Sequence, residues 1–302
     1  MSKKLILADY NHMLNKYFYG FKDIFIERDG EKINTGTILG FSLFVERLFN
    51  KYDNFKLIFC MDGIRTKNRI DEEYKSNRES KKQVHELTDD IIDILSNINE
   101  IYFAKGEYSE ADDLIASLAY SSKDKFDEII IYSGDKDFWQ LLDDFKVSNE
   151  YNKGFKFVDS NLVFQKFGVS QSDLLSFRVL DGDKSDNLKP PVLRIRTEFK
   201  KEIAEKWKDG NIDTFIQLMY EYKDDKRWGK SALSYLENID KVENNLRIMD
   251  LKKYSNPDNR ITNYKLFKNK TPDKNKINFY GLRQYEVFLY DYLKSNKNVI
   301  CS

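Results

Sequence analysis

The chain has little of what disulfide frameworks and histidine-based metal sites require: two cysteines and two histidines in 302 residues. Cys60 and Cys301 lie far apart in the sequence and build neither a disulfide framework nor a thiolate zinc site, which suits a reducing compartment. With only His12 and His85, a histidine-rich metal centre is excluded and a Ser-His-Asp triad is disfavoured. We expect both histidines to lie at the surface or to have satisfied hydrogen bonds.

Long apolar runs and a net charge are also lacking. No run approaches the ~18 residues of a membrane-spanning helix, and the apolar part of MSKKLILADY at the start is too short for a signal peptide. We therefore expect no membrane partner and a cytoplasmic protein, in the host cytoplasm if the chain is viral. Because 50 Lys and Arg balance 50 Asp and Glu, any binding to nucleic acid must rely on local patches.

What the sequence does contain is a regular alternation of short apolar segments with segments of helical periodicity. Strands are predicted at 4–8, 55–61, 100–106 and 127–133, and helices at 37–52, 84–98 and 109–120. The alternation predicts an α/β fold with a mostly parallel central sheet and flanking helices. Past residue 160 the chain is predicted to be helical apart from polar loops, of which 252–276 is the longest. We therefore expect an α/β core at 1–160 and a helical C-terminal region at 161–302.

Acidic residues follow several of the predicted strands. Asp9 ends the first strand, Asp62 follows the second, and Asp135 and Asp137 follow the strand at 127–133. One such acid is usually an ordinary turn residue. However, the carboxyl ends of parallel strands meet at one edge of the sheet, where ligands bind, so we expect these side chains to lie close together. The next helix starts at the same edge with three acids, Glu110, Asp112 and Asp113.

The segment SEADD at the start of that helix admits two explanations. Ser109 followed three residues later by Asp112 is a capping-box pattern, and acids near a helix N-terminus suit the helix dipole. Alternatively, the acids hold metal ions, because seven carboxylates around one cleft would repel one another strongly without cations. Carboxylate oxygens without His or Cys favour Mg²⁺ or Mn²⁺ over Ca²⁺. Two such ions ~3.5–4 Å apart are the usual arrangement for phosphodiester cleavage.

A further acidic run, LDGDKSDN, contains Asp181, Asp183 and Asp186. Its ordinary explanation is an exposed turn that ends a helix. It does not match the EF-hand pattern, which disfavours a calcium loop. Since Asp183 and Asp186 are three residues apart, both could reach one metal ion from a turn.

The motifs EADDLIA (110–116), YSGDKDFWQLL (132–142) and LDGDKSDN (180–187), in this order, resemble the flap endonuclease and 5′–3′ exonuclease family. The segments MDG (61–63) and EEYKSNR (72–78) match the same family. So does the acid at the end of LILADYN, although family members usually have Gly or Phe where Tyr10 stands. The resemblance covers about residues 4 to 190 and implies a PIN-like 5′-nuclease core.

The resemblance also implies a role for each matching position. A first Mg²⁺ would be held by Asp9, Asp62, Glu110 and Asp112. A second would be held or oriented, partly through water, by Asp113, Asp135, Asp137, Asp183 and Asp186, and Mn²⁺ could replace either ion. Lys75 and Arg78 match the basic pair of the family's helical arch, here 63–83, which contacts the scissile phosphate. Without the neighbouring motifs, YKSNRESKK would instead indicate a solvated basic helix face.

Basic residues flank these acidic segments. Between Ile64 and His85, seven Lys and Arg stand against four Asp and Glu, and basic residues also outnumber acids from Lys184 to Lys208. Such flanks suit a substrate whose phosphates are bound outside a metal site. Tyr74 could stack on an unpaired base or simply pack in the interior. The residues that we expect to contact nucleic acid are Tyr74, Lys81, Lys82, Arg194, Arg196, Lys200 and Lys201.

The chain departs from the family in the turn after Asn187. Many members have a Gly-rich sequence there, IPGVxGIGxKTA, which grips the duplex backbone and often binds potassium, whereas this chain has LKPPVLRIRTEF. The departure puts a potassium site in doubt and leaves the duplex to be bound by side chains. In this respect the chain is similar to the ribonuclease H of T-even phages, a member that removes RNA primers.

These observations predict a Mg²⁺-dependent 5′–3′ exonuclease and flap endonuclease with ribonuclease H activity. It would remove RNA primers and 5′ flaps during lagging-strand replication by two-metal hydrolysis. The implied partners are DNA and RNA–DNA hybrids with 5′ ends or flaps, a single-stranded-DNA-binding protein and a sliding clamp, and the protein would be a monomer. Two alternatives stay open: a PIN-type single-stranded ribonuclease, and a catalytically inactive protein that binds branched DNA.

Overall fold

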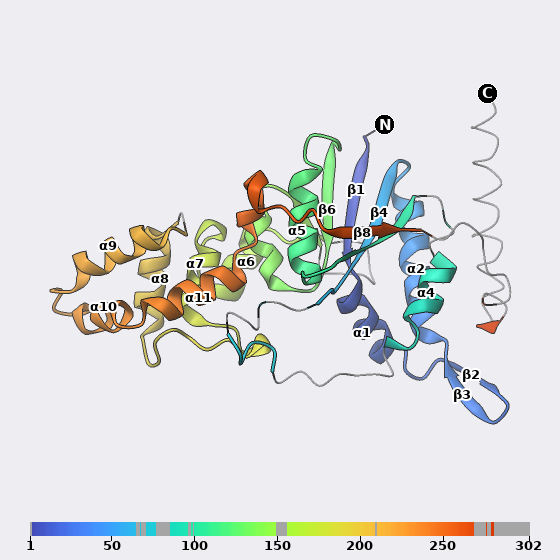
Figure 1. Ribbon diagram of the computed structural model, residues 1–302, viewed down its shortest axis with the longest axis horizontal. Coiled ribbons are helices and arrows are strands. Elements are labelled where there is room, and N and C mark those ends of the chain that lie inside the picture. The colour runs from blue at the N-terminus through green and yellow to red at the C-terminus, as the bar shows by residue number, and fades with distance from the viewer. Residues whose placement is uncertain are drawn as a thin grey trace.

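The computed structural model describes residues 2–64, 67, 71–76, 85–95, 98, 100–148, 156–208, 210–268, 276, 279 and 280 (Figure 1). A six-stranded sheet in the order β7-β6-β1-β4-β5-β8 forms its centre. The parallel strands are β1 (Lys4–Asp9), β4 (Phe55–Met61), β5 (Ile101–Gly106), β6 (Glu128–Tyr132) and β7 (Lys146–Ser148), and β8 (Tyr264–Phe267) runs antiparallel to β5. The predicted α/β class with a mostly parallel sheet is confirmed.

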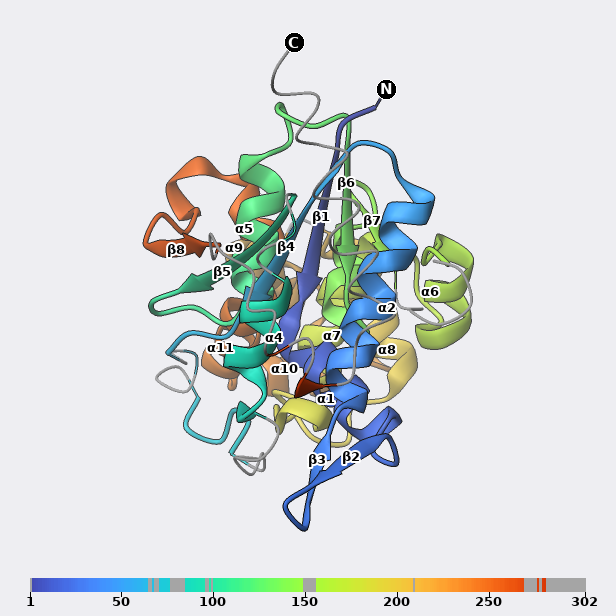
Figure 2. The same ribbon diagram turned by 90° about the vertical axis from the view of Figure 1, so that its right-hand side faces the viewer.

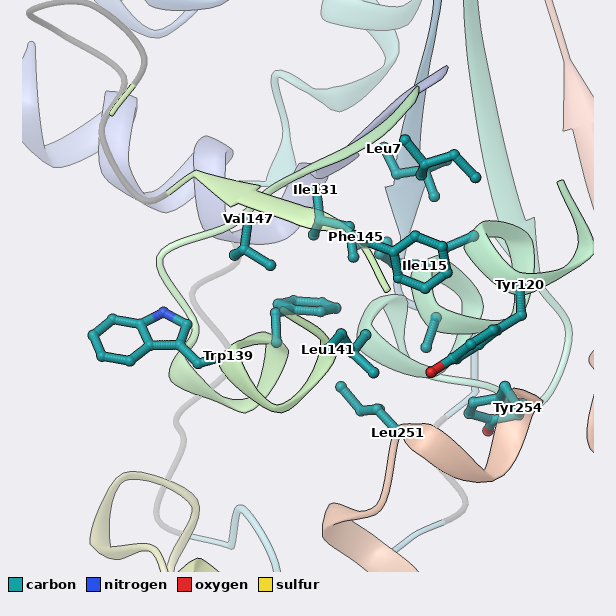
Figure 3. Packing of buried hydrophobic residues seen from close by; sticks show 14 of the residues in the cluster. Leu7, Ile115, Tyr120, Ile131, Trp139, Leu141, Phe145, Val147, Leu251 and Tyr254 are labelled. Carbon is teal, nitrogen blue, oxygen red and sulfur yellow. The ribbon is translucent and has the colours of Figure 1, made fainter. Parts of the chain in front are cut away.

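Helices cover both faces of the sheet because its central strands are apolar on both faces. One face packs against α1 (Tyr10–Gly20), α2 (Gly36–Lys51) and α4 (Thr88–Leu95), and the other packs against α5 (Ala111–Ser121) and the 3-10 segment η2 (Lys136–Leu141). In β1, Ile6 and Ala8 belong to the first cluster, whereas Leu5 and Leu7 belong to the second. Figure 3 shows the second cluster, where Leu7 and Ile131 lie close to Ile115 of α5.

Two β elements differ from the sequence-based expectation. Strands β2 (Phe25–Arg28) and β3 (Glu31–Asn34) form a hairpin that projects at the bottom of Figure 2. The turn residues Asp29 and Gly30 have φ values of 52° and 83°, as a two-residue hairpin turn of this hand requires. Strand β8 lies in the segment that we predicted to be a loop; it is short and largely exposed at the sheet edge, where it pairs antiparallel with β5.

The second half of the chain is mostly helical. It contains α6 (Ser160–Phe167), α7 (Leu174–Asp181), α8 (Thr197–Lys206), α9 (Ile212–Tyr222), α10 (Gly229–Leu236) and α11 (Ile239–Met249), with short 3-10 segments that include η4 (Lys184–Asp186). Helices α7 to α11 extend to the left of the sheet in Figure 1 and enclose a separate apolar cluster with Phe199, Trp207 and Tyr235. Among the helices that the sequence predicts past residue 160, the one at 282–293 lies outside the described residues. In the described part of the chain, no helix has the length and hydropathy needed to cross a membrane.

After α11 the chain returns to the sheet. The side-chain amide of Gln140 in η2 donates to the carbonyl of Met249 at 3.0 Å, and its oxygen accepts from the backbone N–H of Leu251 at 3.0 Å. Further on, the backbone N–H of Ile261 donates to Ser117 Oγ of α5 at 2.8 Å, just before β8. The C-terminal half therefore supplies a strand to the sheet, and a domain division at residue 160 stays a prediction.

Candidate metal centre

The carboxyl ends of β1 and β6 are tied together by Asp9. Its Oδ1 accepts from the backbone N–H of His12 at 2.9 Å, which caps α1, and its Oδ2 accepts from Ser133 Oγ at 3.0 Å. The next residue, Gly134, is needed for close packing, because a Cβ there would lie 2.4 Å from the His12 ring. His12 is thus packed against the turn that carries Asp135, and burial lowers the pKa of its imidazole.

Asp62 links the end of β4 to the start of α5. Its Oδ1 accepts from the backbone N–H of Ala111 at 2.8 Å, and its Oδ2 accepts from Asn11 Nδ2 at 2.9 Å. The capping box expected from Ser109 is wrong, since Glu110 is the N-cap residue and makes no capping hydrogen bond through its side chain. A long-range acceptor therefore satisfies the helix terminus where a local one was predicted.

The first carboxylate group consists of Glu110, Asp112 and Asp113, whose oxygens lie within 4.8 Å of one another. The ammonium of Lys67 lies among them, 3.0 Å from Asp112, 3.2 Å from Asp113 and 3.6 Å from Glu110. Lys253 approaches Asp113 at 3.9 Å from the returning C-terminal segment. Asp113 thus groups with Glu110 and Asp112, and not with the acids of the second ion as the resemblance implied.

Tyr74 and Lys75 reach the same group from the basic segment. The Tyr74 hydroxyl donates to Glu110 Oε2 at 2.8 Å, and Lys75 Nζ lies 3.0 Å from Glu110 Oε1 and 3.7 Å from Asp186. The backbone N–H of Lys75 also donates to the carbonyl of Asp186 at 2.7 Å, which supports its left-handed φ of 53°. Because Tyr74 is only 3% exposed, its ring offers no surface for base stacking, and that prediction is wrong.

The second carboxylate group consists of Asp137, Asp183 and Asp186, again within 4.8 Å of one another. The guanidinium of Arg178 lies 2.5 Å from both Asp137 and Asp183. Asp135 stands beside this group and accepts from the backbone N–H of Asp137 at 2.9 Å. Neither Arg178 nor Lys67 was a predicted site residue, and the only sequence signal for Arg178 is its position five residues before Asp183.

The electrostatics show where positive charge is short. The pKa of Asp9 is raised to about 7, mainly by burial, with smaller contributions from repulsion by Asp62 and Asp135. Burial likewise raises the pKa of Asp137 to about 8, with repulsion from Asp135 as the next cause. Burial also acts to raise the pKa of Asp112, but the charges of Lys67 and Lys75 outweigh it and lower that pKa. The electrostatic contacts run from Asp62 through Asp9 and Asp135 to Asp137, so these acids connect the two groups.

The basic residues expected to contact nucleic acid fall into different environments. Arg194 and Arg196 are exposed in the segment before α8, and Lys201 is half-buried in that helix. Lys200 is only 7% exposed and pairs with Asp181 at 2.9 Å. In contrast to the prediction, it is therefore not available to a phosphate in this structure. Arg78, Lys81 and Lys82 lie outside the described residues.

Comparison with known proteins agrees with this architecture. Residues 4–168 match the family model described as the N-terminal resolvase-like domain of the 5′–3′ exonucleases. The chain belongs to the 5′–3′ exonuclease family. This is a family of nucleases, which hydrolyse phosphodiester bonds, and the resemblance inferred from the motifs is confirmed.

Related sequences cover different shares of the chain. A 5′–3′ exonuclease of Buchnera aphidicola from Acyrthosiphon pisum is 31% identical over 164 residues, which are 53% of this chain and 56% of that protein. The corresponding protein of Buchnera aphidicola from Schizaphis graminum is 29% identical over 250 residues, 80% of this chain and 83% of that protein. DNA polymerase I of Streptococcus pneumoniae is 27% identical over 201 residues, but the match spans only 23% of the polymerase.

Solved structures share the fold at low sequence identity. The bacteriophage T5 protein crystallised with metal ions has a TM-score of 0.66 at 16% identity, covering 84% of this chain and 91% of that one. The catalytic core of Rad2 in complex with a DNA substrate has a TM-score of 0.52 at 16% identity, covering 99% of this chain and 91% of that one. These likenesses support the PIN-like 5′-nuclease fold, whereas the roles of individual residues rest on the geometry described above.

Proposed function

We propose that the chain is a divalent-metal-dependent 5′-nuclease that hydrolyses phosphodiester bonds near 5′ ends or flaps of DNA and RNA–DNA hybrids. The observation that carries this proposal is the convergence of carboxylates at one sheet edge. They come from the end of β1, the residue after β4, the start of α5, the segment at η2 and the turn at η4. A purely structural role would not favour so many buried and half-buried like charges.

The donor set fits hard divalent cations. All members of both carboxylate groups are Asp or Glu. The raised pKa values of Asp9, which lies between the groups, and of Asp137 indicate that these two carboxylates lack sufficient positive charge around them. When bound, Mg²⁺ or Mn²⁺ would activate a water molecule and stabilise negative charge on the phosphate. We assign one ion to Asp9, Asp62, Glu110 and Asp112, and a second to Asp135, Asp137, Asp183 and Asp186.

The chain's own cations complement this arrangement. Lys75 lies between the two carboxylate groups, where its ammonium can bind a phosphoryl oxygen and stabilise the charge that develops there. Asp113, which lies beside Lys67 and Lys253, is assigned to position these lysines next to Glu110 and Asp112 in the metal-free protein. Tyr74 fixes the carboxylate of Glu110 through its hydroxyl hydrogen bond. These contacts orient ligands and phosphate before any reaction.

Exposed cations outside the acidic cleft would hold the rest of the substrate. Arg194 and Arg196 lie in the segment between η4 and α8, directly after the turn that supplies Asp183 and Asp186. We propose that they contact phosphates of a duplex while its 5′ strand enters the metal centre. The helical region at 161–302 would then serve as the DNA-binding part, and removal of RNA primers and 5′ flaps is the biological role that we propose.

One incubation series tests the proposed function. A 5′-labelled flap and a nicked RNA–DNA hybrid are incubated with Mg²⁺, with chelator, and with an Asp135→Asn variant. We expect the unaltered protein to cleave with Mg²⁺ but not with chelator, and Asp135→Asn not to cleave in either condition. The control variant Asp143→Asn carries the same change at an exposed position and should cleave with Mg²⁺ as the unaltered protein does. Equal cleavage by Asp135→Asn would refute the metal assignment. Cleavage of plain single-stranded RNA without preference for an end would indicate a PIN-type ribonuclease, and junction binding without hydrolysis an inactive binding protein.

A further inference from the structure

A cation of the protein itself lies inside the first carboxylate group. Lys67 Nζ is 3.0, 3.2 and 3.6 Å from oxygens of Asp112, Asp113 and Glu110, and the whole residue is only 5% exposed. A surface lysine that pairs with one acid needs no explanation, but a buried ammonium surrounded by three carboxylates lies where their oxygens converge. That point is also next to Glu110 and Asp112, to which we assign the first metal ion.

The second carboxylate group carries cations of the chain as well. Arg178 lies 2.5 Å from Asp137 and Asp183, and Lys75 reaches Asp186 at 3.7 Å while it also contacts Glu110. Each group is therefore partly compensated by cations of the protein itself. Lys67 differs from the other two cations in that it contacts all three members of one group.

Two cations cannot share the first group at low cost. A Mg²⁺ ion binds carboxylate oxygens at ~2.0–2.1 Å, which is closer than the Lys67 ammonium approaches any of them. With both cations present, a charge of +2 would stand within a few Å of an ammonium that is shielded from water, and their repulsion would be strong. The divalent ion brings more positive charge to the same oxygens, so it should displace the lysine.

We propose that Lys67 is the resident counter-ion of the first carboxylate group and that a divalent metal ion displaces its ammonium when it binds. This inference rests on the proposed function and adds an exchange step to it. The displaced ammonium leaves a buried site next to the metal centre and becomes available to a substrate phosphate. Because coupling between two ligands is reciprocal, a phosphate that binds Lys67 would in turn favour metal binding. Metal and nucleic acid would therefore bind cooperatively.

The first experiment follows the reactivity of Lys67 in the unaltered full chain. The protein is acetylated briefly with acetic anhydride in EDTA and in Mn²⁺, and the modified lysines are quantified by mass spectrometry. We expect Lys67 to react at least about fivefold faster with Mn²⁺, which is the lower end of usual coupling between ligands. Lys123, whose side chain is 53% exposed and pairs with Asp144, serves as the internal control and should not change. An unchanged rate at Lys67 while Mn²⁺ is bound would overturn the exchange.

The second experiment measures Mn²⁺ affinity of Lys67→Gln by isothermal titration calorimetry. The exchange predicts tighter binding, by at least about fivefold, because no ammonium has to leave. A lysine that merely positions the carboxylates would have the opposite effect, so equal or weaker binding would contradict the proposal. Lys123→Gln is the matched control and should bind as the unaltered protein does. If Lys67→Gln does not fold, the acetylation result on the unaltered chain decides.

The two proposals fail in different ways. Mn²⁺ binding and cleavage without a change at Lys67 would leave the nuclease intact and refute only the exchange. A protein that neither binds Mn²⁺ nor cleaves would refute both.

Discussion

The backbone N–H of Ala111 donates to the carboxylate of Asp62 at 2.8 Å, so the residue that follows β4 caps the first turn of α5. An uncharged acceptor could perform the same capping, whereas a metal ion needs the charge. The two tasks of Asp62 can therefore be separated by substitution.

Without metal, Asp62→Asn should be close in stability to the unaltered protein, because the loss of the acceptor for Asn11 Nδ2 offsets the removal of a buried charge. The amide oxygen keeps an acceptor for the backbone N–H of Ala111. The substitution also removes a carboxylate whose charged form is disfavoured, as its raised pKa shows, first of all because of burial. Asp62→Ala loses the acceptor and should be less stable than Asp62→Asn by about 1 kcal/mol. Urea unfolding in EDTA measures the difference, and equal stability of the two variants would show that the cap contributes nothing. In calorimetry, both variants should bind Mn²⁺ more weakly, and Asp143→Asn should not.

The loss of stability with rising pH should be offset when metal is added. Burial is the main cause that raises the pKa of Asp9 from 3.8 to about 7 and that of Asp137 from 3.8 to about 8. Between these pH values the folded protein therefore holds protons that the unfolded chain has released. The stability that these protons provide is lost as pH rises from about 4 to about 8, so Tm in EDTA should fall across this window. Metal binding requires the deprotonated acids, so the increase of Tm caused by Mn²⁺ should grow with pH.

Thermal unfolding at several pH values, in EDTA and in Mn²⁺, checks this expectation. Asp9→Asn should flatten the decline in EDTA, because it removes one of the groups that take up a proton, whereas Asp143→Asn should leave the decline as it is. A Tm that rises with pH in EDTA would contradict the assigned burial of these acids.

The sequence predicts that these acids lie close together for a topological reason. Where parallel strands alternate with helices, an acid at a strand end such as Asp9, Asp62 or Asp135 must lie at the shared carboxyl edge. Neither the exact path of the chain nor side-chain packing is needed for that inference. The fold class follows from the same alternation.

The cations of the site could not be predicted in this way. Lys67 lies in a segment without apolar periodicity, so its position depends on long-range contacts that no local pattern encodes. Tyr74 and Lys200 are amphipathic residues, which sequence alone allows either inside or outside, and the structure buries both. The prediction of a capping box at the start of α5 fails for a related reason. The acceptor at this helix terminus is Asp62, which is distant in sequence, and not Ser109.

Arg178 should be important for the metal-free fold. Its guanidinium contacts Asp137 and Asp183, and its side chain is only 11% exposed. Arg178→Met leaves these carboxylates without their partner and should lower the free energy of unfolding in EDTA by about 3 kcal/mol, as is typical when one member of a buried ion pair is removed. Saturating Mn²⁺ should restore part of that loss, because the added charge replaces the guanidinium.

The matched control for this change is Arg247→Met, which removes an exposed arginine and should alter stability little. Urea unfolding of both variants with and without Mn²⁺ provides the measurement. A loss in Arg178→Met that Mn²⁺ leaves untouched would mean that packing, and not charge compensation, is the contribution of Arg178.

Arg196 and Lys200, four residues apart, should have opposite phenotypes. Arg196 is exposed, so Arg196→Gln should weaken flap binding and reduce the slope of log affinity against log salt by about 1, as expected for one lost phosphate contact. Lys200 is 7% exposed and pairs with Asp181, so Lys200→Gln should lower stability and leave the salt slope unchanged.

Fluorescence anisotropy of a labelled flap at several salt concentrations, in Ca²⁺ or EDTA to prevent cleavage, measures the slopes, and urea unfolding measures the stabilities. Lys123 lies just before β6, where the parallel strands begin, and so at the end of the sheet opposite the metal centre. Lys123→Gln should therefore change neither the slope nor the affinity. If Lys200→Gln reduces the slope as much as Arg196→Gln does, Lys200 must leave Asp181 and contact the substrate. In that case the DNA-binding face would include α8 itself, and the original sequence-based prediction for Lys200 would hold in the complex.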